Sequence, residues 1–190
     1  MRIVGGDWRG RPLKAPAGRG TRPTADRVRE SIFNILAHGR VSFVFQEARV
    51  LDVFAGSGSL AFEALSRGAE HATFIEKDRT AIHTIQHNAG VLGVGRTIVV
   101  LPLDGARLPV PPIKAKAPFN LLFMDAPYDQ GLTQPALLGL INKGWLAPEA
   151  VMVVETSAHE TLIVPTAFEF IDERRFGAAN VSFLRLKQNS

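Results

Sequence analysis

From residue 49 onward, short apolar runs alternate with segments whose apolar residues recur at helical spacing. The apolar runs are rich in β-branched residues and predict strands over 49–54, 72–76, 97–101, 119–124 and 150–155. The intervening segments predict helices near 59–67, 79–92 and 133–143, and Asp78 is suited to cap the second of them. Nearly all residues of 119–124 are apolar, as in parallel strands covered on both faces. This alternation indicates an α/β sheet.

The two ends of the chain carry different patterns. Residues 167–172 and 181–186 predict an antiparallel hairpin at the sheet edge. Residues 1–14 predict a short hairpin, and a loop leads from it to a helix that has Thr24 as its N-cap and ends near Gly39. We therefore predict an α/β fold in two parts. These are an N-terminal hairpin and helix extension over 1–40, and a Rossmann-like domain over 41–190 with a mixed seven-stranded sheet and helices on both faces.

A glycine turn lies between the first predicted strand and helix of the larger domain. Gly56 and Gly58 lack Cβ, so the backbone there can adopt positive φ and approach a ligand closely, beside the free N–H groups of a helix start. The spacing Gly56-x-Gly58-x-x-Ala61 fits the dinucleotide fingerprint, and Glu76 lies 20 positions beyond Gly56. Dinucleotide sites and S-adenosylmethionine (SAM) sites both hold ribose hydroxyls with such a carboxylate, so both ligands stay open, as does a turn that only packs.

Composition narrows the class of protein. A chain of 190 residues with 46% hydrophobic and 21% charged residues fits one globular domain. It has no cysteine, which excludes disulfides, cysteine nucleophiles and thiolate metal sites. No apolar run approaches the ~20 residues of a membrane span and no signal-peptide core is present, so we expect a cytoplasmic protein. His83 and His87 lack the glutamate of a HExxH motif, so no metal site is expected there. No P-loop lysine follows the glycines, so the turn is not a nucleoside-triphosphate P-loop.

The basic excess lies in the first 40 residues. They hold nine Lys/Arg and three Asp/Glu, a net charge of +6, whereas the other 150 residues have a net charge of −2. Trp8 lies among Arg9, Arg11 and Lys14, and Arg19 extends this basic track. Cations beside an aromatic plane suit phosphates and unpaired bases, so these four cations are candidate RNA-contacting residues. Two alternatives stay open: Trp8 only pins the hairpin to the domain, and the cations form a solvated surface without a partner.

A second chemical signal follows the strand predicted at 119–124, where Asp125-Ala126-Pro127-Tyr128 opens onto the same crevice as the glycine turn. Here the chain resembles the amino-methylating SAM-dependent methyltransferases, whose motif is Asn/Asp-Pro-Pro-Tyr/Phe. It is more closely similar to the bacterial small-subunit (16S) ribosomal RNA guanine-N2-methyltransferases. The similarity covers nearly the whole chain and includes Arg2-Ile3-Val4-Gly5, Trp8-Arg9-Gly10-Arg11, Thr21-Arg22-Pro23-Thr24-x-Asp26-Arg27-Val28-Arg29-Glu30, Leu51-Asp52-x-Phe54-Ala55-Gly56-Ser57-Gly58 and Phe176-Gly177.

The resemblance implies a Rossmann-like methyltransferase fold and methyl transfer from SAM to N2 of a guanine, with ribosomal RNA or the small subunit as partner. Transfer of a methyl group from a sulfonium requires no metal, and we expect a monomer. The resemblance further implies that Asp125 Oδ and the Ala126 carbonyl accept the hydrogens of the amine. Tyr128 would stack on the base, and Pro127 would stiffen the turn. Proline is usual where Ala126 stands. Alanine keeps the carbonyl but loses the fixed φ, so a slower enzyme or a changed substrate is expected.

The resemblance also implies a set of cofactor-binding residues. The methionine part of SAM would lie near Asp52, Gly56 and Gly58, with Phe54 in the same loop. Glu76 would hold the ribose hydroxyls. Near the adenine the resemblance places Lys77, Asp104 and Gly105, and on the N-terminal side of the pocket Arg22, Thr24 and Arg27.

Three other functions remain open at this point. A DNA adenine-N6-methyltransferase uses the same acceptor motif, although the chain has no obvious target-recognition domain. An NAD-dependent oxidoreductase would use the glycine fingerprint. A catalytically inactive RNA-binding module is conceivable because of Ala126.

Overall fold

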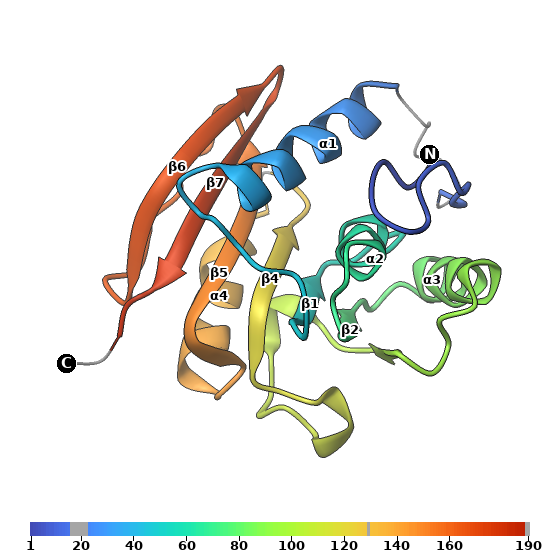
Figure 1. Ribbon diagram of the computed structural model, residues 1–190. Helices are drawn as coiled ribbons and strands as arrows, with labels where there is room; N and C mark the ends of the chain where they lie inside the picture. The colour runs from blue at the N-terminus through green and yellow to red at the C-terminus, as the bar shows by residue number, and fades with distance from the viewer. Residues whose placement is uncertain (16–22, 129, 189–190) are drawn as a thin grey trace.

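The computed structural model describes residues 1–15, 23–128 and 130–188. Within them, seven strands form one sheet in the order β3-β2-β1-β4-β5-β7-β6 (Figure 1). The parallel strands are β1 (Arg49–Val53), β2 (His71–Ile75), β3 (Ile98–Leu101), β4 (Phe119–Asp125) and β5 (Leu146–Ser157). The last two, β6 (Phe168–Phe176) and β7 (Ala179–Leu186), form a hairpin in which β7 is antiparallel to both neighbours. The predicted mixed sheet is confirmed.

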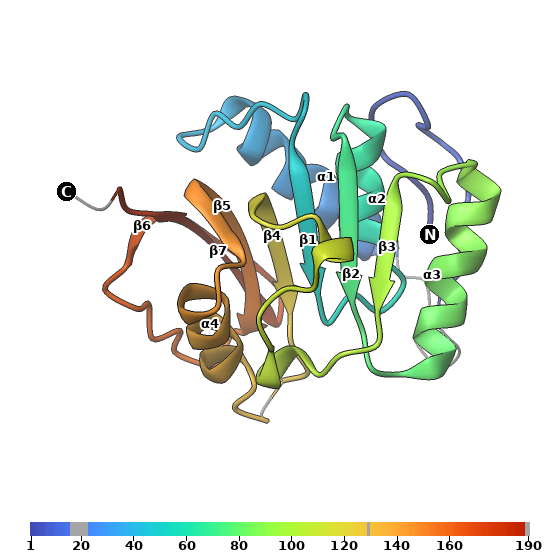
Figure 2. The same ribbon diagram turned by 90° about the horizontal axis from the view of Figure 1, so that it is seen from below.

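Helices cover both faces of the sheet. On one face lie α1 (Pro23–His38), α2 (Ser59–Ser66) and α3 (Arg79–Leu92), and on the other lie α4 (Thr133–Asn142) and the short 3-10 turns η1 (Gly105–Arg107) and η2 (Ile113–Ala115). Figure 2 shows α1 and α2 behind the strands and α4 in front. Successive residues of a strand point to opposite faces. Along β4, Leu121 and Phe123 therefore pack in the core under α1 and α2, whereas Leu122 and Met124 pack in the core under α4.

Some element boundaries differ from the prediction. Helix α1 begins at Pro23, so Thr24 lies inside its first turn and is not the N-cap. Proline favours that first position because its φ is already helical and its missing N–H has no partner there anyway. The strand β5 begins at Leu146, before a bulge that contains Pro148 and Glu149 and that lacks a strand-like pattern. The predicted cap of α3 is confirmed, because Asp78 accepts a hydrogen bond from the Ala81 N–H at 2.8 Å.

The first 15 residues contain the predicted short hairpin. Arg2 and Pro12 form an antiparallel bridge, and the Ile3 and Leu13 N–H groups donate across it to the Arg11 and Met1 carbonyls. The segment also contacts the end of α2. The Asp7 N–H donates to the Ser66 carbonyl at 2.8 Å. A Cβ on Gly6, whose φ is +72°, would lie 1.9 Å from that carbonyl oxygen, so only glycine allows this approach.

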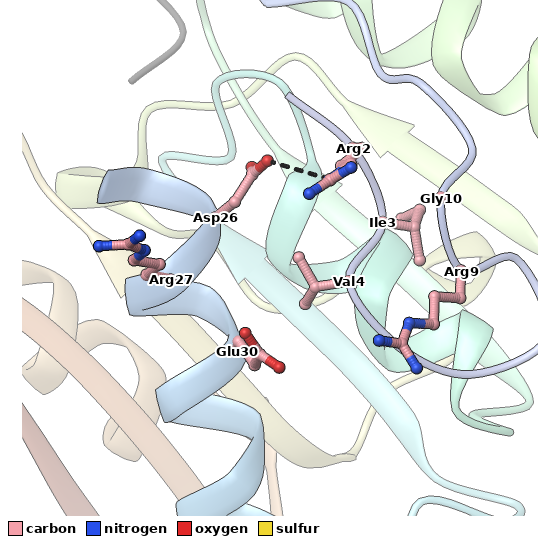
Figure 3. A pocket seen from close by; sticks show the side chains of 8 residues that line it. All are labelled: Arg2, Ile3, Val4, Arg9, Gly10, Asp26, Arg27 and Glu30. Carbon is pink, nitrogen blue, oxygen red and sulfur yellow. Dashed lines mark ion pairs between the residues drawn. The ribbon is translucent and has the colours of Figure 1, made fainter. Parts of the chain in front are cut away.

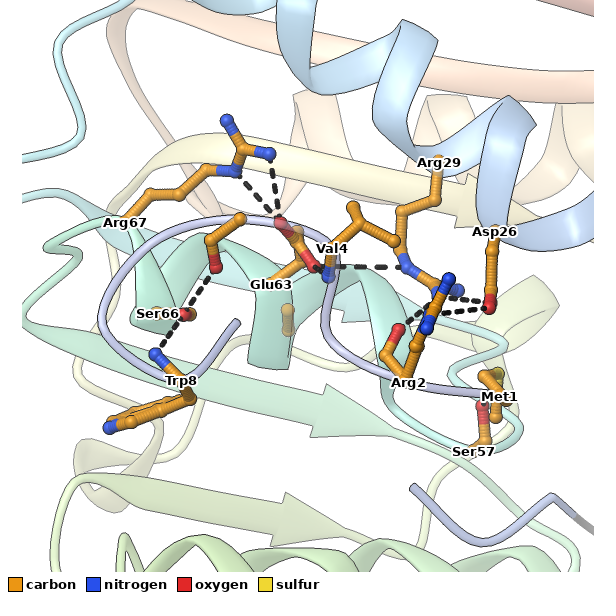
Figure 4. A network of polar contacts seen from close by, with 12 residues as sticks. Met1, Arg2, Val4, Trp8, Asp26, Arg29, Ser57, Glu63, Ser66 and Arg67 are labelled. Atoms are coloured by element: carbon orange, nitrogen blue, oxygen red, sulfur yellow. Dashed lines mark hydrogen bonds and ion pairs between the residues drawn. The ribbon is translucent and has the colours of Figure 1, made fainter. Parts of the chain in front are cut away.

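A buried ionic network joins the N-terminal segment, α1 and α2 (Figure 4). Its centre is Glu63, which is fully buried on α2 and accepts hydrogen bonds from the Val4 N–H at 2.8 Å and from Arg67 Nε at 2.9 Å. Arg29 on α1 lies 3.9 Å from the same carboxylate and also donates to the Arg2 carbonyl and to Asp26. The N-terminal segment therefore packs on the same core as the sheet, and the division of the chain at residue 40 stays a prediction.

Candidate active site

The order of the strands places the two chemical motifs side by side. The chain passes from β1 outward to β2 and β3, and then returns to place β4 on the other side of β1. Ligands of open α/β sheets bind where the strand order reverses in this way, beyond the carboxyl ends of the strands. The glycine turn follows β1 and Asp125 ends β4, with Val53 paired to Met124 in the register of these strands. The two loops therefore lie side by side at the carboxyl ends of β1 and β4, as predicted.

The glycine turn leaves no room for a side chain at Gly58. Gly58 caps α2 with φ of 76°, and a Cβ there would lie 2.7 Å from the Phe74 ring and 2.8 Å from the Phe62 ring. Phe54 adopts a φ of 61° at the end of β1. Such a φ costs a bulky residue on the order of 1–3 kcal/mol, and strain of this kind collects at functional sites.

The carboxylate of Glu76 is fixed against the same turn. Its two oxygens accept hydrogen bonds from the Gly56 N–H and the Asp78 N–H, each at 2.9 Å. The acidic residue 20 positions after the first glycine therefore lies where the fingerprint predicts it, at the carboxyl end of the neighbouring strand.

A cavity of about 380 Å³ opens between these loops, a volume in the range of small-molecule sites. Seven of the predicted site residues line it: Phe54, Gly56, Glu76, Lys77, Gly105, Asp125 and Pro127. Its other described lining residues are Ile75, Asp78, Ala81, Leu103, Gln130 and Leu132, which sequence reasoning missed. Ile75 and Leu103 lie beside predicted strand ends, but nothing in the sequence distinguishes them from core residues.

The charge of this crevice distinguishes between the two candidate ligands. Among its described lining residues, Glu76, Asp78 and Asp125 are carboxylates and Lys77 is the one cation. Lys77 Nζ also lies 3.2 Å from Asp104 Oδ2. The pKa of Asp104 is lowered, first by the Ala106 N–H and then by Lys77, so this carboxylate is ionised. A negative crevice favours a sulfonium cation over the pyrophosphate of a dinucleotide.

Two predicted cofactor residues lie behind the crevice instead of lining it. Asp52 is 1% exposed, and it accepts a hydrogen bond from the Ala61 N–H at 3.3 Å near the start of α2. Burial raises the pKa of Asp52 well above its usual range, and the charges of Asp125 and Glu76 raise it further. Gly58 packs on phenylalanine rings. The structure thus gives both residues a contact within the loop.

A second, smaller cavity adjoins the crevice on the side of the acceptor motif. It measures about 200 Å³ and is lined by Asp125, Ala126, Pro127, Tyr128 and Glu155, so it shares Asp125 and Pro127 with the crevice. Tyr128 is 38% exposed, and its hydroxyl donates a hydrogen bond to Glu155 Oε1 at 2.6 Å. We call this space the acceptor pocket.

The predicted basic residues lie at the N-terminal side of the molecule. Arg9, Arg11 and Lys14 are exposed, whereas the Trp8 side chain is partly buried on the core. The backbone N–H of Trp8 donates to Ser66 Oγ at 3.0 Å. Arg27 does not line the crevice. It lines a separate cavity of about 400 Å³ between α1 and the N-terminal segment, together with Arg2, Ile3, Val4, Arg9, Gly10, Asp26 and Glu30 (Figure 3). Arg19 and Arg22 lie outside the described residues, and of Thr24 only its place in α1 is described.

One buried side chain connects the N-terminal segment to the glycine turn. Asn88 on α3 is fully buried, and its Nδ2 donates to the Ser57 carbonyl at 3.1 Å and to the Lys14 carbonyl at 3.0 Å. Its Oδ1 accepts from the Lys14 N–H at 2.8 Å. The three bonds hold the end of the basic segment against the loop that borders the crevice.

Comparison with known proteins places the chain in a family. Residues 1–185 match the family described as "Conserved hypothetical protein 95". The chain belongs to this family. It is 42% identical over 162 residues to ribosomal RNA small subunit methyltransferase D of Escherichia coli, with 85% of this chain and 77% of that protein covered. It is 37% identical over 193 residues to the protein of the same name from Haemophilus influenzae, with 100% and 94% covered.

Solved structures agree with this family assignment. An Escherichia coli protein described as a candidate methyltransferase superposes with a TM-score of 0.81 at 37% identity, covering 100% of this chain and 99% of that one. In the described part of the chain, no helix is long and apolar enough to cross a membrane. No group of three or more His, Asp or Glu side chains suited to a metal ion is found among the described residues.

Proposed function

We propose that this protein is a SAM-dependent methyltransferase that methylates the exocyclic N2 amine of a guanine in small-subunit ribosomal RNA. The observation that carries the proposal is the meeting of Asp125 with the glycine turn over one negatively charged crevice. Methyltransferases of small-subunit ribosomal RNA among its relatives, at 42% and 37% identity, support the class of substrate.

The described crevice residues fit SAM. When bound, SAM supplies a methyl group on a sulfonium and leaves as neutral S-adenosylhomocysteine. Glu76 would hold the ribose hydroxyls, while Ile75 and Leu103 supply apolar contacts for the adenine beside Lys77 and Asp104. Phe54 and the glycine turn would enclose the methionine part, and the surrounding carboxylates would stabilise the sulfonium charge.

The acceptor motif would orient a weak nucleophile. The lone pair of the guanine N2 amine is delocalised into the ring, so the amine attacks only when it is pyramidal. Asp125 Oδ and the Ala126 carbonyl would accept its two hydrogens and favour that geometry. Methylation would leave the nitrogen cationic, and the Asp125 carboxylate would take the proton that it releases. Ala126 is 3% exposed, so neighbouring packing restrains the turn without the usual proline.

The N-terminal cations would position the RNA. Arg9, Arg11 and Lys14 are exposed on a segment that Asn88 holds beside the glycine turn, which suits contact with phosphates near the target base. An unpaired guanine reaches such a site most readily, because a paired base must first leave its helix.

Transfer of labelled methyl from SAM tests this function. The protein is incubated with unmodified small ribosomal subunits, with naked ribosomal RNA and with DNA, and the labelled nucleoside is identified. We expect label on N2 of guanine in the ribosomal substrates and none on DNA. Label confined to N6 of adenine in DNA would contradict the proposal.

A further inference from the structure

We propose that Glu155 reads the N1–H of the target guanine and thereby makes the acceptor pocket selective for guanine over adenine. This inference rests on the proposed function, because it concerns the base held by the same pocket. Glu155 belongs to no motif in the sequence. The structure alone brings it to the pocket, at the carboxyl end of β5.

The sheet places Glu155 beside Asp125. The two residues are partners in the parallel register of β4 and β5. Paired residues on neighbouring strands lie about 5 Å apart and project from the same face of the sheet. Both line the acceptor pocket, a cavity of about 200 Å³ that adjoins the crevice at Asp125. A base with its amine at Asp125 therefore presents the adjoining part of its edge to Glu155.

The edge of guanine matches two neighbouring carboxylates. The Watson–Crick edge of guanine carries the N1–H donor next to the N2 amine, whereas adenine has an acceptor lone pair at N1 next to its amine. An ionised carboxylate only accepts hydrogen bonds. Glu155 would therefore bind the guanine N1–H and repel the adenine N1, while Asp125 engages the amine of either base.

Tyr128 fixes the carboxylate in this orientation. Its hydroxyl donates a hydrogen bond to Glu155 Oε1 at 2.6 Å, and Oε2 would accept the hydrogen bond from the base. Glu155 is itself half-buried. A hydrogen bond to a charged group there should favour guanine over a base that lacks the N1–H by about 10- to 100-fold in kcat/KM. Tyr128 is thus a positioning residue for Glu155, in addition to any contact it makes with the ring.

A base analogue and one substitution test the inference together. The guanine that the wild-type protein methylates in small-subunit RNA is mapped, and the same RNA is prepared by ligation with 2-aminopurine at that position. 2-Aminopurine keeps the 2-amino group but has an acceptor at N1. We expect the wild-type kcat/KM to be about 10- to 100-fold lower on this RNA than on the guanine RNA.

Glu155→Gln should change this preference because its amide can donate to N1. We expect the variant to lose activity on guanine and to narrow or reverse the guanine preference, with SAM affinity and Tm unchanged. Glu149→Gln, an exposed change on the same strand, is the matched control and should keep the wild-type ratio.

Three outcomes overturn the inference in distinguishable ways. Equal wild-type activity on guanine and 2-aminopurine would show that no group reads N1, whatever the variant does. If Glu155→Gln keeps the wild-type ratio of kcat/KM on guanine RNA to kcat/KM on 2-aminopurine RNA, a group other than Glu155 contacts N1 of the base. Absence of guanine methylation by the wild-type protein would contradict the proposed function, and the inference with it.

Discussion

Burial is the largest influence on the pKa of two side chains, Asp52 and His71. His71 on β2 is 2% exposed, and its Nε2 lies 3.0 Å from Thr73 Oγ1, whose hydroxyl donates to the Ala115 carbonyl at 2.8 Å. The imidazole therefore donates to Thr73 as a neutral ring. Burial, together with Lys116, lowers the pKa of His71 from 6.5 to about 4.

This shift predicts a pH-dependent contribution to stability. Because the folded pKa of His71 lies below the unfolded value, its contribution is complete above pH 6.5 and is lost as the pH falls to about 4. The loss amounts to at most about 3 kcal/mol. His71→Gln keeps a donor for Thr73 and does not titrate. We expect the difference in free energy of unfolding between wild type and variant, from urea titrations, to shift by this amount across the window. A pH-independent difference would contradict the assignment.

At the same scale, local sequence pattern identified only part of the site. Gly56, Glu76 and Asp125 were predictable because each follows an apolar strand at a position where ligands bind. Asp52 and Gly58 belong to the same motif but do not line the crevice. Asp52 accepts a hydrogen bond from the Ala61 N–H, and Gly58 packs against phenylalanine rings. The sequence alone does not distinguish such structural contacts from contacts with a ligand. The proposed role of Glu155 has no signal in the sequence, because it depends on the pairing of β4 with β5 and lies far from any motif.

Among the elements, periodic strands and helices were predictable and irregular segments were not. The strands from β1 to β4 match their predicted ranges to within a residue or two, because buried apolar runs define them. The start of β5 was missed, since its bulge holds Pro148 and Glu149. The short N-terminal hairpin was predictable, but its position depends on contacts with α2 and α3.

The link between α3 and the glycine turn gives a prediction at this scale. Asn88→Ala removes three hydrogen bonds, to backbone groups of Ser57 and Lys14, which should lower the free energy of unfolding by about 3 kcal/mol. The loosened loop should also weaken SAM binding, as measured by calorimetry. The neighbouring exposed residue provides a control, His87→Ala, for which both quantities should stay at wild-type values. Unchanged SAM affinity in Asn88→Ala would show that the loop does not need this support.

The molecule as a whole separates its charges. The first 40 residues carry a net charge of +6 and the remainder −2, and the exposed cations Arg9 and Arg11 lie outside the negative crevice. One region therefore suits the phosphates of RNA and the other suits a cationic methyl donor. The pattern of net charge was visible in the sequence, but the negative lining of the crevice needed the fold.

RNA binding should accordingly depend on salt. Each cation that contacts a phosphate of single-stranded RNA contributes about 0.7 to the slope of log affinity against log salt. Replacing Arg9 and Arg11 with glutamine should reduce the slope by about 1.4 and weaken binding at low salt, as measured by fluorescence anisotropy. Glutamine at the exposed Arg174 and Arg175 of β6 is the control. An equal effect of both double variants would show that the basic segment has no special role.

The most direct test of the account is the effect of Asp125→Ala on methyl transfer and on SAM binding, measured in the same preparation. If Asp125 orients the amine, kcat for methylation of unmodified small-subunit RNA should fall by at least about 100-fold. The fold should be retained, and the affinity for SAM should fall far less than kcat, because we expect Glu76 and the glycine turn to provide most of the contacts with the donor. Turnover by the variant at a rate comparable to wild type would contradict the proposed role of Asp125 and the mechanism built on it.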